Sequence, residues 1–320
     1  MKAIVVKEFG GPEVLEVVEV ADPVAGAGQV LVDIHAAGVN PVETYVRSGK
    51  YPRLPELPYT PGSDGAGVVA AIGEGVDNVH VGDRVYIYGS LTGTYAEKAL
   101  CLSSQVYPLP DRLTTAQGAA LGVPYGAAWR ALFHRGKAQK GETVLIHGAT
   151  GAVGIATVQF ALAAGLNVIA TAGSERGRLL VHKQGAHHVL THEDANDPVQ
   201  IRKITDGRGV DIIIEMLANV NLAKDLGNLA KYGRVVIVGS RGPIEIDPRM
   251  TMTLDADIRG MTLMNATPEE LQEMHRAFAV AIADGTIHPV IDEKVPLAEA
   301  PRAHVDVLQG ESYGKIVLTP

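Results

Sequence analysis

The chain has 320 residues, of which 46% are hydrophobic and 20% charged, a composition typical of a folded globular protein with room for two domains. Its formal net charge of −8 argues against attraction of nucleic acid by the whole surface, although it does not exclude a local basic patch. The single cysteine, Cys101, excludes an internal disulfide and any metal site built from several cysteines.

Neither a secretory leader nor a membrane-spanning segment is expected. Only the apolar residues 3–6 separate Lys2 from the charged Lys7, which is too short for the core of a signal peptide. No apolar run approaches the ~20 residues that cross a bilayer. Together with the low cysteine content, these features predict a soluble cytoplasmic protein with no membrane partner.

The first third of the chain alternates short β-type runs with turns rich in glycine and proline, which predicts a compact β domain. From Ala116 to His134 the alanines and leucines recur at helical spacing, although we expect Pro124 to break or kink this helix. The predicted strands of the first third cover residues 3–6, 14–20, 30–35, 67–72 and 84–87.

A strand, a glycine turn and a helix are predicted over residues 144–161. In the dinucleotide pattern G-x-G-x-x-G, Ala149 takes the first place and Gly151 and Gly154 the second and third. The first N–H groups of a helix are unpaired and carry partial positive charge, so this turn predicts a seat for a pyrophosphate. Glycine spacing alone is a weak signal, but a strand at 167–171 supplies the expected βαβ context.

Further strand and helix units follow this turn. The runs at 210–214 and 234–238 are continuously apolar, which is typical of a parallel sheet covered on both faces. A helix is expected to begin at Thr267 and to end at Gly285. A last helix and strand within 297–318 return the chain to the first domain. The predicted fold class is α/β, with a doubly wound parallel sheet over 125–265 inserted in a mainly β domain split between 1–124 and 266–320.

Four longer stretches carry a family resemblance: Gly38-Val39-Asn40-Pro41-Val42-Glu43-Thr44-Tyr45, Pro58-Tyr59-Thr60-Pro61-Gly62-Ser63-Asp64, Ile213-Ile214-Glu215-Met216-Leu217-Ala218-Asn219-Val220-Asn221-Leu222 and Val238-Gly239-Ser240-Arg241-Gly242. These stretches and the order of the elements resemble the medium-chain dehydrogenase/reductase superfamily, and within it the zinc-free quinone oxidoreductase, or zeta-crystallin, branch. The resemblance covers essentially the whole chain. It implies a Rossmann NADP-binding domain inserted in a split, GroES-like catalytic domain.

The resemblance also implies that no metal is bound. Zinc-dependent relatives place a cysteine at the position of Asn40 and a histidine at the position of Ser63, so this chain lacks the thiolate and imidazole of their catalytic site. The histidines at 182, 187, 188 and 192 form a cluster whose spacing matches no zinc pattern, and they are interpreted as solvated. We read Cys101 as a small buried hydrophobe.

In this family NADPH reduces a quinone or a conjugated carbonyl compound, and the negative charge that develops on the acceptor oxygen must be stabilised. Asn40, Tyr45 and Tyr51 resemble the family positions that line the substrate cleft, and they are the candidate catalytic donors. Tyr51 could instead be a loop tyrosine packed on prolines, and Tyr45 could mainly touch the cofactor.

The cofactor residues are also carried over from the family, position by position. One departure is Ala152, where many relatives have a glycine, because its methyl group could crowd a phosphate. His192 is implied near the adenosine end, and residues 261–263 are implied to close an apolar nicotinamide pocket. The full set implied by the resemblance is Tyr45, Thr150, Gly151, Ala152, Val153, Gly173, His192, Asn221, Val238, Gly239, Ser240, Arg241, Met261, Thr262 and Leu263.

The strand at 167–171 bears on the choice between NADH and NADPH. Enzymes that prefer NAD place a carboxylate about 20 residues past the glycine turn, where it binds the ribose 2′-hydroxyl and repels a 2′-phosphate. Here the strand leads into Gly173 and Ser174, with no carboxylate before Glu175. Ser174, Arg176 and Arg178 can donate to a phosphate, although a lysine that many relatives carry falls at Gly177. Two alternatives stay open: Glu175 could point inward, and Arg176 could be a solvated loop residue. The pattern predicts NADPH as the cofactor.

Two alternatives to a quinone reductase stay open. One is an NADPH-dependent reductase of 2-alkenals or enones on the same fold, since fold and cofactor do not fix the acceptor. The other is a crystallin-type protein that binds NADPH or RNA without turnover, although the net charge speaks against RNA as the main partner. The resemblance further implies a homodimer or homotetramer, for which residues 258–263, beside the last strand of the nucleotide-binding domain, are the candidate interface.

Overall fold

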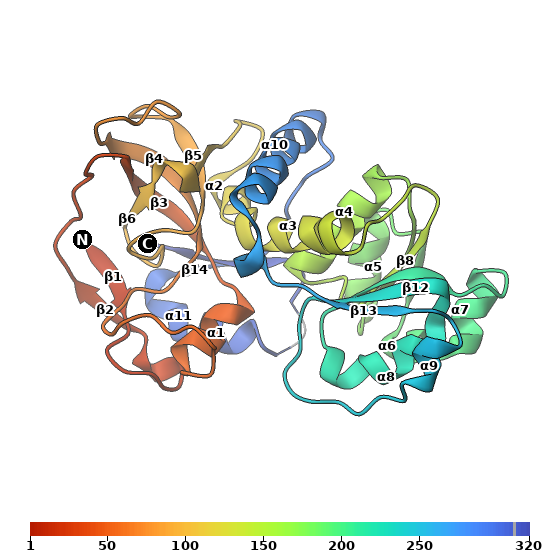
Figure 1. Cartoon of the computed structure of the whole chain (residues 1–320). Coiled ribbons are helices and arrows are strands. Elements are labelled where there is room, and N and C mark those ends of the chain that lie inside the picture. Colours follow the sequence, from red (N-terminus) through yellow and green to blue (C-terminus); the bar gives the residue numbers. More distant parts are fainter. Residues whose placement is uncertain (310–311) are drawn as a thin grey trace. The chain divides into compact units, whose positions relative to one another are not determined.

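The computed structural model describes residues 1–309 and 312–320 (Figure 1). The chain forms two compact units, one made of Met1–Val123 and His288–Pro320 and the other of Pro124–Ile287. The sequence placed the second boundary at 265/266 instead. The difference is helix α10 (Pro268–Asp284), which belongs to the second unit because its Phe278 stacks on Phe160 in that unit's core.

The first unit is mainly β. Strand β3 (Gln29–Gly38) is its centre and pairs antiparallel with β4, β6 and β15. Val30 and Val32 of β3 are fully buried in the core of this unit. The seven-stranded sheet has the order β14-β15-β3-β4-β5-β7, with β6 paired to β3, and β1 and β2 form a separate pair. The other strands are β1 (Lys2–Val5), β2 (Glu16–Glu19), β4 (Asp64–Ile72), β5 (Arg84–Tyr88), β6 (Lys98–Leu102), β7 (Val106–Pro108), β14 (Ile291–Pro296) and β15 (Lys315–Thr319).

Short helices complete this unit. Helix α1 (Pro41–Arg47) begins with a capping box, in which the backbone N–H of Asn40 donates to Glu43 Oε2 at 2.8 Å. The remaining helical segments are η1 (Pro12–Val14), η2 (Ser103–Gln105), α2 (Thr115–Gly118), η5 (Leu297–Glu299) and α11 (Ala300–Asp306).

The second unit contains a parallel sheet of six strands in the order β10-β9-β8-β11-β12-β13. Helix α4 packs on β8 and β9, and helix α8 packs on β11 and β12. Residues 144–146 and 212–214 are fully buried, as expected for strands covered on both faces. This confirms the predicted doubly wound α/β fold. The strands are β8 (Thr143–Ile146), β9 (Asn167–Thr171), β10 (His188–Leu190), β11 (Val210–Glu215), β12 (Leu229–Ile237) and β13 (Asp257–Gly260).

The helix expected between residues 116 and 134 is interrupted, but not at Pro124. The interruption lies between α2 and α3 (Gly122–Trp129), and Pro124 falls in the first turn of α3. A proline is tolerated there because first-turn N–H groups have no partner within the helix. The other helical segments of the second unit are η3 (Arg130–Arg135), α4 (Ala152–Ala163), α5 (Glu175–Lys183), α6 (His192–Ala195), α7 (Pro198–Ile204), α8 (Ala218–Asn228), α9 (Arg249–Met252) and η4 (Leu263–Asn265).

An aromatic cluster surrounds the single tryptophan in this unit. The ring of Trp129 lies 4.4 Å from that of Phe133 and 5.3 Å from that of Phe160. Phe278 of α10 closes the cluster, with its ring 6.3 Å from Trp129. Trp129 therefore reports on the packing of the second unit.

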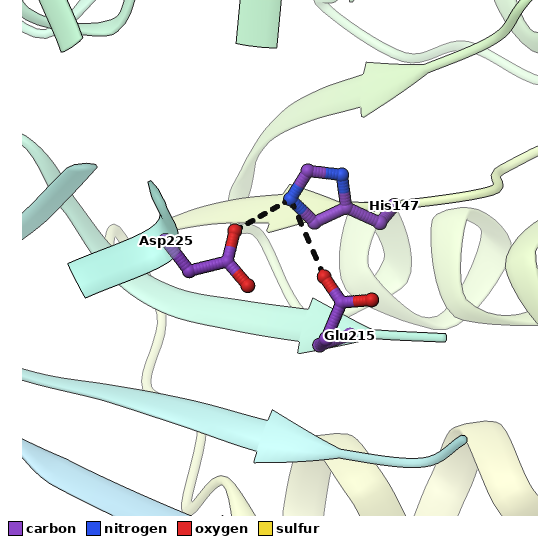
Figure 2. A group of neighbouring side chains, drawn as sticks. All are labelled: His147, Glu215 and Asp225. Atoms are coloured by element: carbon purple, nitrogen blue, oxygen red, sulfur yellow. Dashed lines mark hydrogen bonds and ion pairs between the residues drawn. The ribbon is translucent and has the colours of Figure 1, made fainter. Parts of the chain in front are cut away.

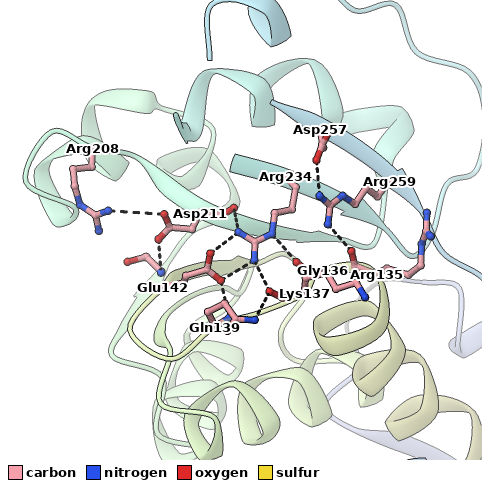
Figure 3. A network of polar contacts seen from close by, with 11 residues as sticks. Arg135, Gly136, Lys137, Gln139, Glu142, Arg208, Asp211, Arg234, Asp257 and Arg259 are labelled. Carbon is pink, nitrogen blue, oxygen red and sulfur yellow. Dashed lines mark hydrogen bonds and ion pairs between the residues drawn. The ribbon is translucent and has the colours of Figure 1, made fainter. Parts of the chain in front are cut away.

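A buried arginine joins β12 to the loop before β8 (Figure 3). The Arg234 guanidinium donates to both carboxylate oxygens of Glu142, at 2.6 and 2.7 Å. It also donates to the backbone carbonyls of Gly136, Lys137 and Asp211. All five N–H groups of the guanidinium are thereby used, and the residue is only 7% exposed.

No helix in the described part of the chain combines the length and the apolar character that crossing a membrane requires.

Candidate cofactor and substrate sites

The glycine turn lies between β8 and α4, as the sequence predicted. Gly148 has φ of +58°, a backbone conformation that favours glycine. Gly154 lies so close to the turn that an added Cβ would sit 2.4 Å from the carbonyl oxygen of Gly148. Gly151 is the N-cap of α4 and gives it no side-chain cap. The helix therefore begins with backbone N–H groups available to a pyrophosphate.

The segment after β9 begins the next helix. Ser174 is the N-cap of α5, where its Oγ accepts a hydrogen bond from the N–H of Gly177 at 3.1 Å. Arg176 is exposed in the first turn of that helix. An added Cβ on Gly177 would lie 2.8 Å from Cγ2 of Thr150, so this chain lacks space for the lysine that many relatives carry there. An added Cβ on Gly173 would lie 3.4 Å from the ring of His192, so these two residues lie against each other.

The turn after β11 and the loop after β12 are locked together. The N–H groups of Val238 and Gly239 both donate to the backbone carbonyl of Glu215, and the N–H of Ala218 donates to the carbonyl of Gly239. Asn221 Nδ2 donates to Glu215 Oε1 at 3.2 Å.

Side-chain hydrogen bonds also fix residues 240–242 of the loop after β12. The backbone N–H of Arg241 donates to Asn219 Oδ1 at 2.8 Å, and Ser240 Oγ donates to the carbonyl of Gly242. Residues 261–263 are half-buried beyond β13. Because the strands are parallel, the predicted cofactor residues of the second unit follow the carboxyl ends of strands of one sheet.

The first unit holds a buried polar cluster around Asn40. The ammonium group of Lys315 donates to Asn40 Oδ1 and lies 3.0 Å from Asp64 Oδ2. Asn40 Nδ2 donates to Asp64 Oδ2 at 3.0 Å and to Glu43 Oε1 at 3.3 Å. All four residues are at most 5% exposed. Burial raises the pKa of Glu43, and Lys315 opposes that shift.

The predicted catalytic residues thus differ in their surroundings. Both amide hydrogens of Asn40 already have acceptors, whereas Tyr45 on α1 and Tyr51 in the following segment are half-buried.

The histidines at 182, 187, 188 and 192 are exposed, as interpreted from the sequence. Cys101 is buried, and burial raises the pKa of its thiol to about 12.

Sequence reasoning missed two buried groups. Lys315 gave no signal, because it joins Asn40 from 275 residues away along the chain. The second group is His147 with Glu215 and Asp225. A ring nitrogen of the histidine and one carboxyl oxygen of each acid all lie within 4.8 Å of one another.

A parallel sheet inserted in a split, mainly β unit is the fold of the medium-chain dehydrogenase/reductase superfamily. Two family models match the chain, "Alcohol dehydrogenase GroES-like domain" over residues 26–111 and "Zinc-binding dehydrogenase" over residues 152–279. The quinone oxidoreductase of Mus musculus is 51% identical over 322 residues and covers 99% of this chain and 97% of the mouse protein. The chain belongs to the quinone oxidoreductase branch of this superfamily.

Solved structures agree with this assignment. A mycobacterial protein complexed with NADPH has a TM-score of 0.91 at 32% identity, with 100% of both chains covered. The Escherichia coli quinone oxidoreductase complexed with NADPH has a TM-score of 0.89 at 28% identity, also with 100% of both chains covered.

The zinc named by one of these family models does not fit the catalytic position in this chain. Asn40 and Asp64 present an amide and a carboxylate, and the Lys315 ammonium group already lies against both. A catalytic zinc takes histidine, cysteine or carboxylate ligands in an open site, and a bound ammonium occupies the place and charge that the ion would need. The side chains at this position therefore do not form a zinc site.

Proposed function

We propose that this protein is an NADPH-dependent reductase of quinones. The observation that carries the proposal is the carboxyl edge of the parallel sheet, where a glycine turn opens α4 and the end of β9 offers Ser174 and Arg176 in place of a carboxylate. This edge fits a dinucleotide with a 2′-phosphate. The relatives named above as quinone oxidoreductases support the choice of acceptor.

In the proposed mechanism NADPH, when bound, supplies a hydride. The backbone at residues 150–153 binds the pyrophosphate, and Ser174 and Arg176 bind the 2′-phosphate. The loop 238–241 supports the nicotinamide half, while Met261 and Leu263 exclude water from it. His192 packs beside the adenosine ribose near Gly173.

On the acceptor side, Tyr45 and Tyr51 are proposed to donate hydrogen bonds to the oxygen that becomes negative. For Asn40 to donate to it, its amide would have to give up a bond to Asp64 or Glu43. We therefore propose that Asn40 acts mainly by fixing the start of α1, which carries Tyr45. The quinol anion that forms can take its proton from water, so the step needs little help from a general acid.

The acceptor is tested by steady-state oxidation of NADPH with a panel of quinones beside a panel of 2-alkenals and enones. We expect higher kcat/KM for the quinones. Tyr45→Phe and Tyr51→Phe should each lower kcat with little change in the Kd for NADPH if they donate to the acceptor. Equal or better turnover of the enones would replace the quinone assignment by its closest alternative.

We also propose that a second copy of this chain pairs along β13. This strand is the outer member of the described sheet, so one of its edges has no neighbouring strand. Ile258 on β13 is 37% exposed, and Met252, six positions earlier, is 73% exposed. Tyr232, whose backbone N–H donates to the carbonyl of Leu254, is 66% exposed. An open edge with apolar neighbours favours pairing with an identical strand. Sedimentation equilibrium should give at least twice the chain mass, and a mass of one chain would refute the pairing.

A further inference from the structure

Three ionisable side chains meet at the carboxyl edge of the parallel sheet, and none of them was among the predicted site residues. His147 directly follows β8, Glu215 ends β11, and Asp225 lies on α8 (Figure 2). Strands β8 and β11 are neighbours in the sheet, although β9 and β10 lie between them in the chain. The cluster therefore lies at the topological switch point, where a doubly wound sheet binds its dinucleotide.

The cluster is closed to solvent. Glu215 and Asp225 are 0% exposed, and His147 is 3% exposed. His147 Nε2 lies 2.9 Å from Asp225 Oδ1 and 3.6 Å from Glu215 Oε2. The shorter distance is that of a hydrogen bond, so a proton lies between the imidazole and Asp225.

The neighbouring elements supply no buried cation to this cluster among the described residues. On α8 the nearest charge is the exposed Lys224, next to Asp225. On α6 the charged form of His192 would repel that of His147. On β12 the apolar Ile237 pairs with Glu215. Among the described residues, the two carboxyl groups thus share one buried site with an imidazole and with no other basic side chain.

Two carboxyl oxygens of the cluster lack a hydrogen-bond partner, and one further proton would supply it. Glu215 Oε1 accepts from the N–H of Leu217 and from Nδ2 of Asn221. Glu215 Oε2 and Asp225 Oδ2 have no donor, although both are buried. A proton on Glu215 Oε2 would donate to Asp225 and would satisfy both oxygens at once.

The direction of the acidities agrees with this placement. Burial raises the pKa of Glu215 and that of Asp225, each to about 7. The contact between the two carboxyl groups raises the pKa of Glu215 and lowers that of Asp225, so Glu215 is the better holder of the proton. The two groups titrate as a coupled pair.

We propose that His147, Glu215 and Asp225 form a proton-sharing cluster in which Glu215 holds the proton that the two carboxyl groups share, and that Glu215 is a positioning residue for the cofactor. Neutral Glu215 holds Asn221 and the start of α8 through Oε1, and its backbone carbonyl holds Val238 and Gly239. Loss of the proton leaves two facing carboxylates in a buried site, whose repulsion loosens both cofactor-binding segments. The link to NADPH rests on the proposed function, whereas the protonation itself does not.

Three variants separate the effect of the Glu215 proton from that of the Glu215 side chain as an acceptor. Glu215→Gln is always neutral, can donate and accept, and should keep NADPH binding at all pH values. Glu215→Leu removes the acceptor for Leu217 and Asn221 and should weaken binding at all pH values. Glu193→Gln changes an exposed carboxylate on α6 and serves as the matched control.

The measurement is the Kd for NADPH by fluorescence titration between pH 6 and 8.5, with thermal unfolding as a check of folding. The 2′-phosphate itself titrates near pH 6, so each variant is compared with the unmodified protein at the same pH. Relative to Glu215→Gln, the unmodified protein should lose about fivefold or more in affinity as pH rises through about 7. An unchanged pH dependence in Glu215→Gln, or weak binding like that of Glu215→Leu, would overturn the proposal.

Infrared spectroscopy tests the protonation without cofactor. The unmodified protein at pH 6 should show the carbonyl absorption of a buried protonated carboxyl group, and Glu215→Gln should lack it. Absence of that band in the unmodified protein would refute the cluster even if quinone reduction were confirmed. Elemental analysis of the purified protein is a further test. A stoichiometric divalent metal that is lost in His147→Ala would show a cation in place of the shared proton and would overturn the proposal.

Discussion

Replacing Arg234 should destabilise the second unit more than any exposed arginine does. Arg234→Met keeps the length of the side chain but removes all five donors, so the Glu142 carboxylate and the carbonyls of Gly136 and Asp211 lose their partner. Breaking a buried ion pair costs about 3–5 kcal/mol. The Glu142 side chain is 22% exposed, so water recovers part of this. We therefore expect a loss of about 3 kcal/mol in the free energy of unfolding.

The assay is denaturant unfolding followed by the fluorescence of Trp129, the only tryptophan and a reporter on the second unit. Arg208→Met is the matched control, because Arg208 is 59% exposed and lies 3.8 Å from Asp211. This control should change stability by less than about 0.5 kcal/mol. Arg234→Met combined with Glu142→Gln should recover part of the loss, because no unpaired charge is left. Equal stabilities for Arg234→Met and Arg208→Met would refute the reasoning.

Three further outcomes are expected. Gly154→Ala forces a Cβ to within 2.4 Å of the Gly148 carbonyl oxygen, so the free energy of unfolding should fall by about 1–3 kcal/mol and NADPH titration should show weaker binding. Lys315→Met leaves Asp64 buried without its cation and should cost about 3 kcal/mol in denaturant unfolding, which a second change, Asp64→Asn, should partly restore. Burial lowers the pKa of His275 to about 3, so protons bind the unfolded chain first as pH falls below about 6.5; His275→Leu should reduce the loss of stability between pH 7.5 and 5 by about 2 kcal/mol.

The fold followed from the sequence because its signals are local. Continuous β-branched runs at 144–146 and 212–214 mark covered parallel strands, and the threonine, proline and glutamates at 267–270 mark the start of α10. The glycine turn is likewise encoded within a few residues. The domain boundary at 265/266 was misplaced because the side to which α10 packs depends on contacts of Phe278 with residues more than 100 positions earlier.

The candidate site was only partly predictable. Residues at the carboxyl ends of β8, β9, β11 and β12 could be named because parallel strands bring these ends to one edge. The partners of Asn40 could not, since Lys315 reaches it from the last strand of the chain. The pairing of His147 with Asp225 depends on how α8 packs on the sheet, which no spacing in the sequence encodes.

The most direct test of the account is the ratio of kcat/KM for NADPH and NADH with one quinone acceptor, measured in the unmodified protein, Ser174→Ala and Arg176→Ala. Charge-assisted hydrogen bonds to the 2′-phosphate should favour NADPH by about tenfold or more, and each substitution should reduce that ratio. A preference for NADH in the unmodified protein would contradict the assignment of the cofactor site. An undiminished NADPH preference in both variants would show that residues other than Ser174 and Arg176 bind the 2′-phosphate.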